Sequence, residues 1–144
     1  MKRSQRIKTI VRLSENKERT AARQFAAVQK TLADFKERLS QLQSYREEYM
    51  GYLKPNGQKL TIKSIREQQA FILQIDEGIR MLTEQIQTQE KMNNHERDKW
   101  LRQKQQLDTM MKIFERFNNT EKQIVELREQ HCLDEISQRQ TANH

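Results

Sequence analysis

The sequence is poor in the residues that interrupt helices, because its 144 residues include one proline and three glycines. Aromatic residues make up 6% of it, and the apolar fraction of 34% is low for the compact core of a globular domain. Charged residues, in contrast, make up 33%, and the residues that abound (Gln, Glu, Arg, Lys, Leu and Ile) are good helix formers. This composition favours long helices with a narrow apolar face.

Two further absences concern the cellular compartment. No run of apolar residues is long enough to span a membrane, and the basic N-terminus is not followed by the apolar stretch of a secretory signal. The single cysteine, Cys132, can form no disulfide within the chain, which indicates a reducing compartment. We therefore expect a cytoplasmic protein.

Residues with catalytic or metal-binding patterns are also scarce. The three histidines, His95, His131 and His144, lack the spacing of a zinc site, and there is no glycine-rich phosphate loop. A rod of two helices offers no concave pocket for a small molecule. We expect no enzymatic activity, no catalytic residue, no cofactor, no metal and no small-molecule substrate.

The strongest helix-breaking cluster lies near the middle of the sequence, where Pro55 is followed by Asn56 and Gly57. It predicts a helix over about 4–53, a turn at about 54–61 and a second helix over about 62–138. Thr61 or Ser64 is expected to cap the second helix. The whole chain, 1–144, is thus expected to form a single helical hairpin.

Apolar residues recur at alternating intervals of three and four in both predicted helices, a repeat typical of a left-handed coiled coil. Because the turn is short, the two helices are expected to run antiparallel, with paired residue numbers adding up to about 115. This register places the polar Ser14 and Glu18 opposite Asn93 and Glu96. The predicted fold is all-α, a long antiparallel two-helix coiled-coil hairpin with an overhanging C-terminal helix.

The second predicted helix is the longer one and is expected to extend beyond the first from about Lys112 onward. This overhang would carry an uncovered apolar stripe that includes Phe114 and Phe117. A bare amphipathic helix usually binds a partner. A frayed tail and a rod that dimerises through this segment are the alternatives.

Positive charge is concentrated at one end of the sequence. The first 30 residues alone account for the net charge of +7, since the charges of the remaining residues cancel. We expect this end to dock on an acidic protein surface. Binding of nucleic acid through phosphate contacts is the alternative, which would make the chain a nucleic-acid-binding coiled coil.

Aromatic residues gather on one side of the predicted hairpin, near the turn. Tyr45 and Tyr52 share a flank of the first helix, Phe71 and Gly78 share a flank of the second, and Tyr45 should lie beside Phe71. Aromatic side chains outside the coiled-coil seam are typical anchors for a partner. Alternatively, they extend the local core.

At these positions the sequence resembles the flagellar FliJ family, the small coiled-coil proteins of the flagellar type III export apparatus. The resemblance extends from about Val11 to Gln138. It is most specific in two motifs on either side of the turn, Leu42-x-x-Tyr45-x-x-Glu48-Tyr49 and Gln68-Gln69-Ala70-Phe71-Ile72. Arg38 and Gly78 depart from the family pattern, where glutamine and alanine are common.

The resemblance implies a cytoplasmic stalk, peripheral to the inner membrane at the flagellar base, that reaches the membrane only through its partners. Those partners would be the flagellar export ATPase hexamer, the cytoplasmic domain of the membrane export-gate protein, and export chaperones that the protein escorts. The gate-contact residues implied by the resemblance are Leu42, Tyr45, Tyr49, Phe71, Ile75 and Gly78. The residues expected to meet the ATPase ring are Arg3, Arg6, Arg12, Arg19, Phe114 and Phe117.

Overall fold

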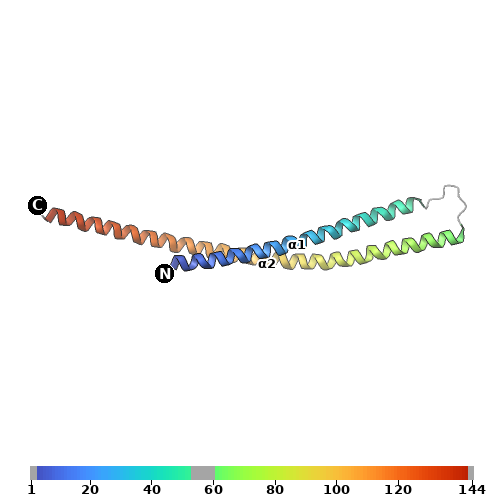
Figure 1. Ribbon diagram of the computed structural model, residues 1–144, viewed down its shortest axis with the longest axis horizontal. Coiled ribbons are helices and arrows are strands. Elements are labelled where there is room, and N and C mark those ends of the chain that lie inside the picture. Colours follow the sequence, from blue (N-terminus) through green and yellow to red (C-terminus); the bar gives the residue numbers. More distant parts are fainter. Residues whose placement is uncertain (1–2, 53–60, 143–144) are drawn as a thin grey trace. The chain divides into compact units, whose positions relative to one another are not determined.

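The computed structural model describes residues 3–52 and 61–142, which form two long α-helices packed against each other (Figure 1). Helix α1 spans Arg3–Tyr52 and helix α2 spans Ile62–Ala142. The predicted helical hairpin is thereby confirmed, with α2 extending four residues further than expected. Most of the predicted turn, residues 54–60, lies outside the described residues.

Helix α2 begins directly after a capping residue. The backbone N–H of Ser64 donates a hydrogen bond of 3.1 Å to the hydroxyl oxygen of Thr61. The backbone N–H of Ile65 donates one of 3.0 Å to the Thr61 carbonyl. A side chain that accepts from the third residue of a helix satisfies an N–H that has no partner within the helix. Of the two expected caps, Thr61 is therefore the one used.

The helices pack as two compact units, which we treat separately. One unit contains the described residues of 1–21 and 100–144, and the other contains residues 22–99. Within each unit, a stretch of α1 lies antiparallel to a stretch of α2. Neither helix contains, among its described residues, a stretch long and apolar enough to cross a membrane.

The least exposed side chains follow the predicted seven-residue repeat along both helices. Because only a narrow seam is covered, even its best-buried residues retain some exposure, from 3% for Ala21 to 9% for Leu32. None of the described side chains is completely buried. The buried apolar residues are Val11, Ala21, Leu32, Ile75 and Ile86.

The pairing of the helices differs from the predicted register, in which paired residue numbers add up to about 115. Trp100 was expected opposite residue 15, but its indole N–H donates to the carboxylate of Glu18 at 2.9 Å. Glu90 was expected opposite residue 25, but it forms an ion pair with Lys36 at 3.6 Å. The two pairs depart from the expected sum of 115 by three and by eleven residues, and a repeat that recurs along both helices does not by itself fix the register.

This register also corrects the expected face-to-face pairing of polar residues. Glu18 accepts its cross-helix hydrogen bond from Trp100. Among the described residues, the buried side-chain oxygens Oδ1 of Asn93, Oε2 of Glu96 and Oε1 of Gln103 have no hydrogen-bond partner. These oxygens in the polar part of the seam therefore lack the hydrogen bonds that the expected pairing of polar residues suggested.

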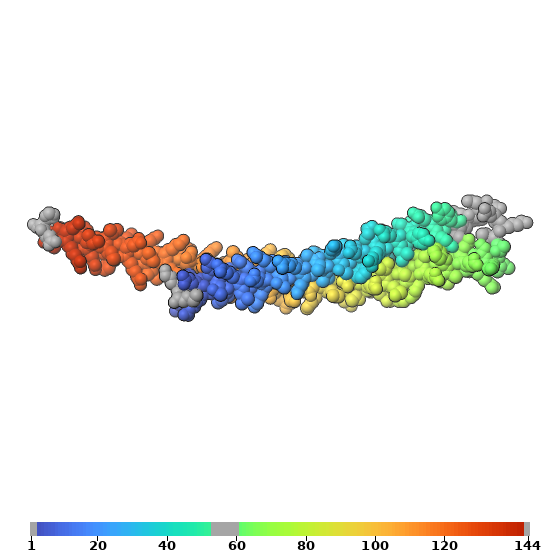
Figure 2. Space-filling model, viewed as in Figure 1, coloured from blue at the N-terminus to red at the C-terminus, as the bar shows by residue number. Residues whose placement is uncertain are grey.

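The overhang of α2 is shorter than expected. Glu121 accepts hydrogen bonds from the backbone N–H and the hydroxyl of Ser4, at 3.2 and 2.5 Å, so α1 covers α2 as far as this residue. From Lys122 onward every described residue is exposed, and Figure 2 shows the red end of α2 without α1 alongside. The expectation of a bare helix from residue 112 is therefore wrong, and Phe114 and Phe117 are half-buried.

Candidate protein-binding surfaces

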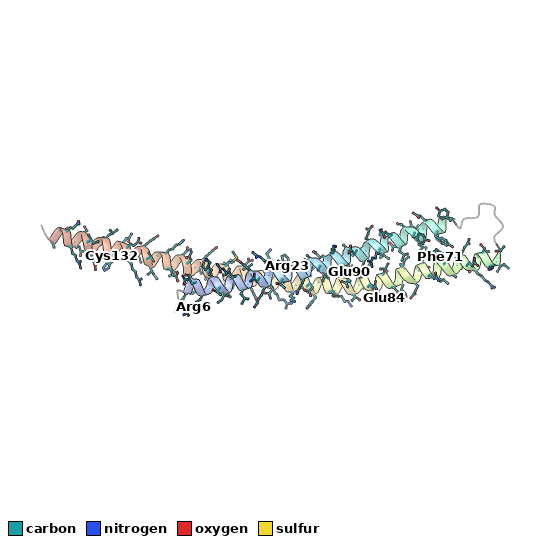
Figure 3. All side chains as sticks on the ribbon, in the orientation of Figure 1. Arg6, Arg23, Phe71, Glu84, Glu90 and Cys132 are labelled. Carbon is teal, nitrogen blue, oxygen red and sulfur yellow. The ribbon has the colours of Figure 1, made fainter. Side chains whose placement is uncertain are left out.

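An aromatic cluster joins the two helices in the unit of residues 22–99. The rings of Tyr45 and Phe71 meet edge to face, with centroids 6.1 Å apart and an interplanar angle of 80°. The centroid of the Tyr49 ring lies 4.6 Å from that of Phe71, with the two rings tilted by 58°. Figure 3 labels Phe71, whose ring on α2 contacts the two tyrosines of α1. The predicted contact of Tyr45 with Phe71 is confirmed, and both arrangements are favourable for aromatic pairs.

The members of this cluster differ in how much surface they offer. The side chain of Tyr45 remains 46% exposed, whereas Tyr49 and Phe71 are half-buried. A half-exposed tyrosine with a fixed ring can cover apolar surface on a partner and still hydrogen-bond through its hydroxyl. Tyr45 is therefore the most exposed ring of the cluster.

The other three residues of the predicted gate surface pack beneath it. A Cβ placed on Gly78 would lie 3.2 Å from Cδ2 of Leu42, which is tighter than ordinary contact. The glycine thus allows the leucine to approach the backbone of α2 closely. Ile75 is only 5% exposed. The structure places Leu42 and Ile75 in the seam, where they support the surface rather than form it.

An ion pair that the sequence analysis missed lies beside this cluster. Nε of Arg46 donates to Oδ1 of Asp76 at 2.5 Å, and this hydrogen bond, together with the carboxylate charge, raises the pKa of Arg46. Arg46 occupies a seam position of the seven-residue repeat, between Leu42 and Tyr49. A charged residue at a seam position is the signal that could have indicated a cross-helix partner.

The four arginines expected to contact the ATPase lie in the other unit, all exposed. They do not form one patch. Arg3 and Arg6 are three residues apart on one face of α1, and Arg12 and Arg19 are seven apart on another, about 160° away. Phe114 lines a shallow groove with Val11 and therefore belongs to the side of the rod on which α1 and α2 meet.

Metal chemistry finds no support in the part of the chain that the structure describes. No group of three or more His, Cys, Asp or Glu side chains is arranged there to hold a metal ion. The surfaces described above present aromatic and apolar side chains in one unit and cationic side chains in the other.

Comparison with known proteins identifies the family. The family described as "Flagellar FliJ protein" matches residues 2–144, almost the whole chain. No curated protein matches the chain, and no solved structure does. A match of this extent, on a sequence that folds into two long packed helices, leads to one conclusion. The chain belongs to the flagellar FliJ family of coiled-coil proteins related to flagellar protein export.

Proposed function

We propose that this protein is a stalk that links the flagellar export ATPase ring to the export gate, and that it also escorts export chaperones. The family is one of export accessory proteins rather than of enzymes. A stalk needs separate binding surfaces on a stiff body, and long helices supply that body. The protein would act in the cytoplasm and reach the inner membrane at the flagellar base only through its partners.

The observation that carries this proposal is the aromatic cluster of Tyr45, Tyr49 and Phe71. Interface anchors are typically aromatic side chains that are held rigidly before the partner arrives. Here Phe71 fixes both tyrosine rings, while Tyr45 still offers nearly half of its surface. We assign this cluster to the cytoplasmic domain of the gate protein.

The unit of residues 1–21 and 100–144 is proposed to bind the ATPase ring. The four arginines are exposed, and the first 30 residues, of which residues 1–21 lie in this unit, carry the whole net charge of the chain, +7. Long-range attraction between this end and acidic groups would speed association and weaken with salt. Phe114 and Phe117 contribute less to this contact than the sequence suggested, because both are half-buried.

Binding of the purified gate domain to immobilised full-length protein tests the first contact. We expect the double substitution Tyr45→Ala and Phe71→Ala to weaken binding by about a hundredfold, because two central aromatic anchors are removed. The matched control is Leu73→Ala with Met81→Ala, which removes two exposed apolar side chains from the same unit. Circular dichroism of each variant checks that the helices remain folded.

Equal loss of binding in the control and in the aromatic variant would contradict the assignment of this surface. The ATPase contact has its own test, since Arg12→Glu with Arg19→Glu should reduce stimulation of the ATPase without altering binding to the gate domain. Retention on DNA that is sensitive to salt and unaffected by the aromatic substitutions would instead support the nucleic-acid alternative.

A further inference from the structure

The contacts between α1 and α2 in the unit of residues 22–99 define which residues lie opposite each other. The numbers of the residues that meet there add up to between 116 and 126 and centre on 121. These pairs are Tyr45–Phe71, Tyr49–Phe71, Arg46–Asp76, Leu42–Gly78, Lys36–Glu90 and Gln24–Lys99. Because both helices repeat every seven residues, their seam residues can meet only at sums seven apart, such as 114, 121 and 128. The sum of 121 is the observed register.

The observed register matches the seam of this unit poorly at both ends. It places Asn93 opposite Val28, and Glu96 opposite Phe25. The buried oxygens Oδ1 of Asn93 and Oε2 of Glu96 have no hydrogen-bond partner among the described residues. At the other end Ile65, the first seam residue of α2, remains 38% exposed. Buried acceptors without a donor and an uncovered seam isoleucine both disfavour this pairing.

A register one heptad away, in which the numbers add up to 114, gives this unit a better apolar seam. An unbroken series of apolar residues on α1 would then face an apolar residue of α2. These pairs are Val28–Ile86, Leu32–Leu82, Phe35–Ile79, Leu39–Ile75 and Leu42–Ile72. Tyr49 would cover Ile65, and Arg46 would face the polar Gln68. We call this pairing the slid register, and it lies within one residue of the one that the sequence pattern predicts.

Contacts beside the apolar seam favour the observed register in the same unit. They bring Tyr45 and Tyr49 onto Phe71, and Arg46 onto Asp76. A slide of one heptad would displace these groups from one another by about 10 Å along the helices, which is the length of seven helical residues. The aromatic cluster of Tyr45, Tyr49 and Phe71 therefore exists in the observed register and not in the slid one.

The other unit, taken by itself, also favours the observed register. Its buried Val11 falls opposite Met110 at a sum of 121, but opposite the polar Gln103 at a sum of 114. The hydrogen bond from Trp100 to Glu18 belongs to the observed register as well. Since α1 and α2 each run through both units, neither register satisfies the seam along the whole chain.

We propose that α1 and α2 slide past each other by one heptad, between the observed and the slid register, and that this slide assembles and dismantles the aromatic cluster. Opposed preferences of this kind leave two pairings close in free energy. Each seam side chain finds an equivalent site one heptad away, so the helices can exchange pairings without unfolding. The slide itself is independent of the proposed function, whereas its effect on binding of the gate rests on it.

Distances between two spin labels in the full-length protein test the slide. The labels are attached to Glu47→Cys and Gln87→Cys in a Cys132→Ser background, and both positions are exposed. In the slid register the labels lie seven residues further apart along the helices. We expect a main separation for the observed register and a second one that is about 10 Å longer. A single separation at all salt concentrations would overturn the proposal.

Removal of the ion pair that belongs to the observed register should shift the two populations. We expect Arg46→Gln to raise the population ratio of the slid to the observed register by about twofold to fivefold, the effect of losing one exposed ion pair. High salt should act in the same direction, because it screens this ion pair. The matched control is Arg80→Gln, which removes a cation that pairs within α2 and should leave the ratio unchanged.

Disulfides can trap each register in turn. Leu39→Cys lies opposite Leu82→Cys in the observed register and opposite Ile75→Cys in the slid one, so the two double variants share one cysteine. In a Cys132→Ser background we expect both disulfides to form under mild oxidation, the second in lower yield. Formation of the first disulfide alone would contradict a slid register.

Binding of the purified gate domain to the two trapped forms connects the slide to the aromatic cluster. We expect the form trapped in the observed register to bind like the wild type. The form trapped in the slid register should bind about a hundredfold more weakly, because the anchors are dispersed, and reduction of its disulfide should restore binding. Circular dichroism checks that both forms remain helical. Equal binding by both trapped forms would overturn the link between register and binding. The spin labels report the slide without the gate domain, so a failure of the proposed function is distinguished from a failure of the slide.

Discussion

The indole of Trp100 and the carboxylate of Glu18 are joined across the helix pair, with a hydrogen bond of 2.9 Å from Nε1 to Oε1. Both residues occupy positions of the seven-residue repeat where a coiled coil usually has two apolar side chains. The ring of Trp100 supplies the apolar side chain that is usual at this position. Its N–H donates a hydrogen bond to the partly buried carboxylate of Glu18. The pair therefore turns an unfavourable seam residue into a specific contact.

Replacing Trp100 with Phe isolates the value of this hydrogen bond. Phenylalanine keeps an aromatic ring beneath Lys104, whose Nζ lies 5.3 Å from the centre of the indole, but it has no donor for Glu18. We expect the free energy of unfolding to fall by about 1–2 kcal/mol, the usual effect of removing a hydrogen bond to a partly buried charged group. Urea unfolding followed by circular dichroism measures it, and a loss that persists equally in a Glu18→Leu background would contradict the explanation.

A second expectation concerns Gly78, where two effects oppose each other. Alanine is favoured over glycine inside a helix by about 1 kcal/mol. The added methyl would, however, lie 3.2 Å from Cδ2 of Leu42 and force that side chain to move. We therefore expect Gly78→Ala to stabilise the protein by about 1 kcal/mol in a Leu42→Ala background, and by clearly less in the wild type. Equal gains in both backgrounds would show that the close contact has no energetic effect.

The sequence predicted which face of each helix lines the seam, but it did not predict which residues of the two helices lie opposite each other. Because each helix repeats every seven residues, the residues that line the seam were identified correctly from Val11 to Ile86 and beyond. The same repeat makes a slip of one heptad nearly invisible, since apolar residues still meet apolar residues. The error appears where side chains have unique partners, as with Trp100 and Glu18 or with Lys36 and Glu90.

The candidate surfaces were predictable to the extent that they depended on local spacing. Tyr45 and Phe71 occupy the same flank of the seam, and their large rings meet as expected. Phe114 lies far from it, so the same analysis placed it on a bare overhang when it is half-buried. The ion pair of Arg46 with Asp76 joins a seam position to a flanking one, and a rule that compares seam positions with each other misses such pairs.

Acidification should affect Glu77 in a defined way. The guanidinium of Arg80 donates hydrogen bonds to its carboxylate and lowers the pKa of Glu77 below the ordinary value of 4.5. Because the pKa of Glu77 is lowered, its contact with Arg80 stabilises the helix at pH values above the ordinary pKa of 4.5. This contribution is lost as the pH falls through the lowered pKa. We expect Arg80→Gln to return the pKa of Glu77 toward 4.5, measured by NMR titration of the side-chain carboxyl. The control is Arg97→Gln, which removes an exposed cation of the same helix that pairs with Asp98 instead of Glu77.

The ion pair of Arg46 and Asp76 is expected to matter more for register than for stability. Its two side chains are 36% and 43% exposed, and an ion pair of that exposure contributes about 0.2–1 kcal/mol. A slip of one heptad, by contrast, would leave Arg46 in the seam without its carboxylate, which is costly for a partly covered charge. Arg46→Leu should therefore change the unfolding free energy little, or even raise it, while allowing more than one pairing of the helices.

Disulfide trapping between cysteines introduced at Leu42 and Gly78, in a Cys132→Ser background, reports the native register. We expect its yield to fall in the Arg46→Leu variant and to remain high when the pair is exchanged as Arg46→Asp with Asp76→Arg. An unchanged yield in Arg46→Leu would show that apolar packing alone sets the register.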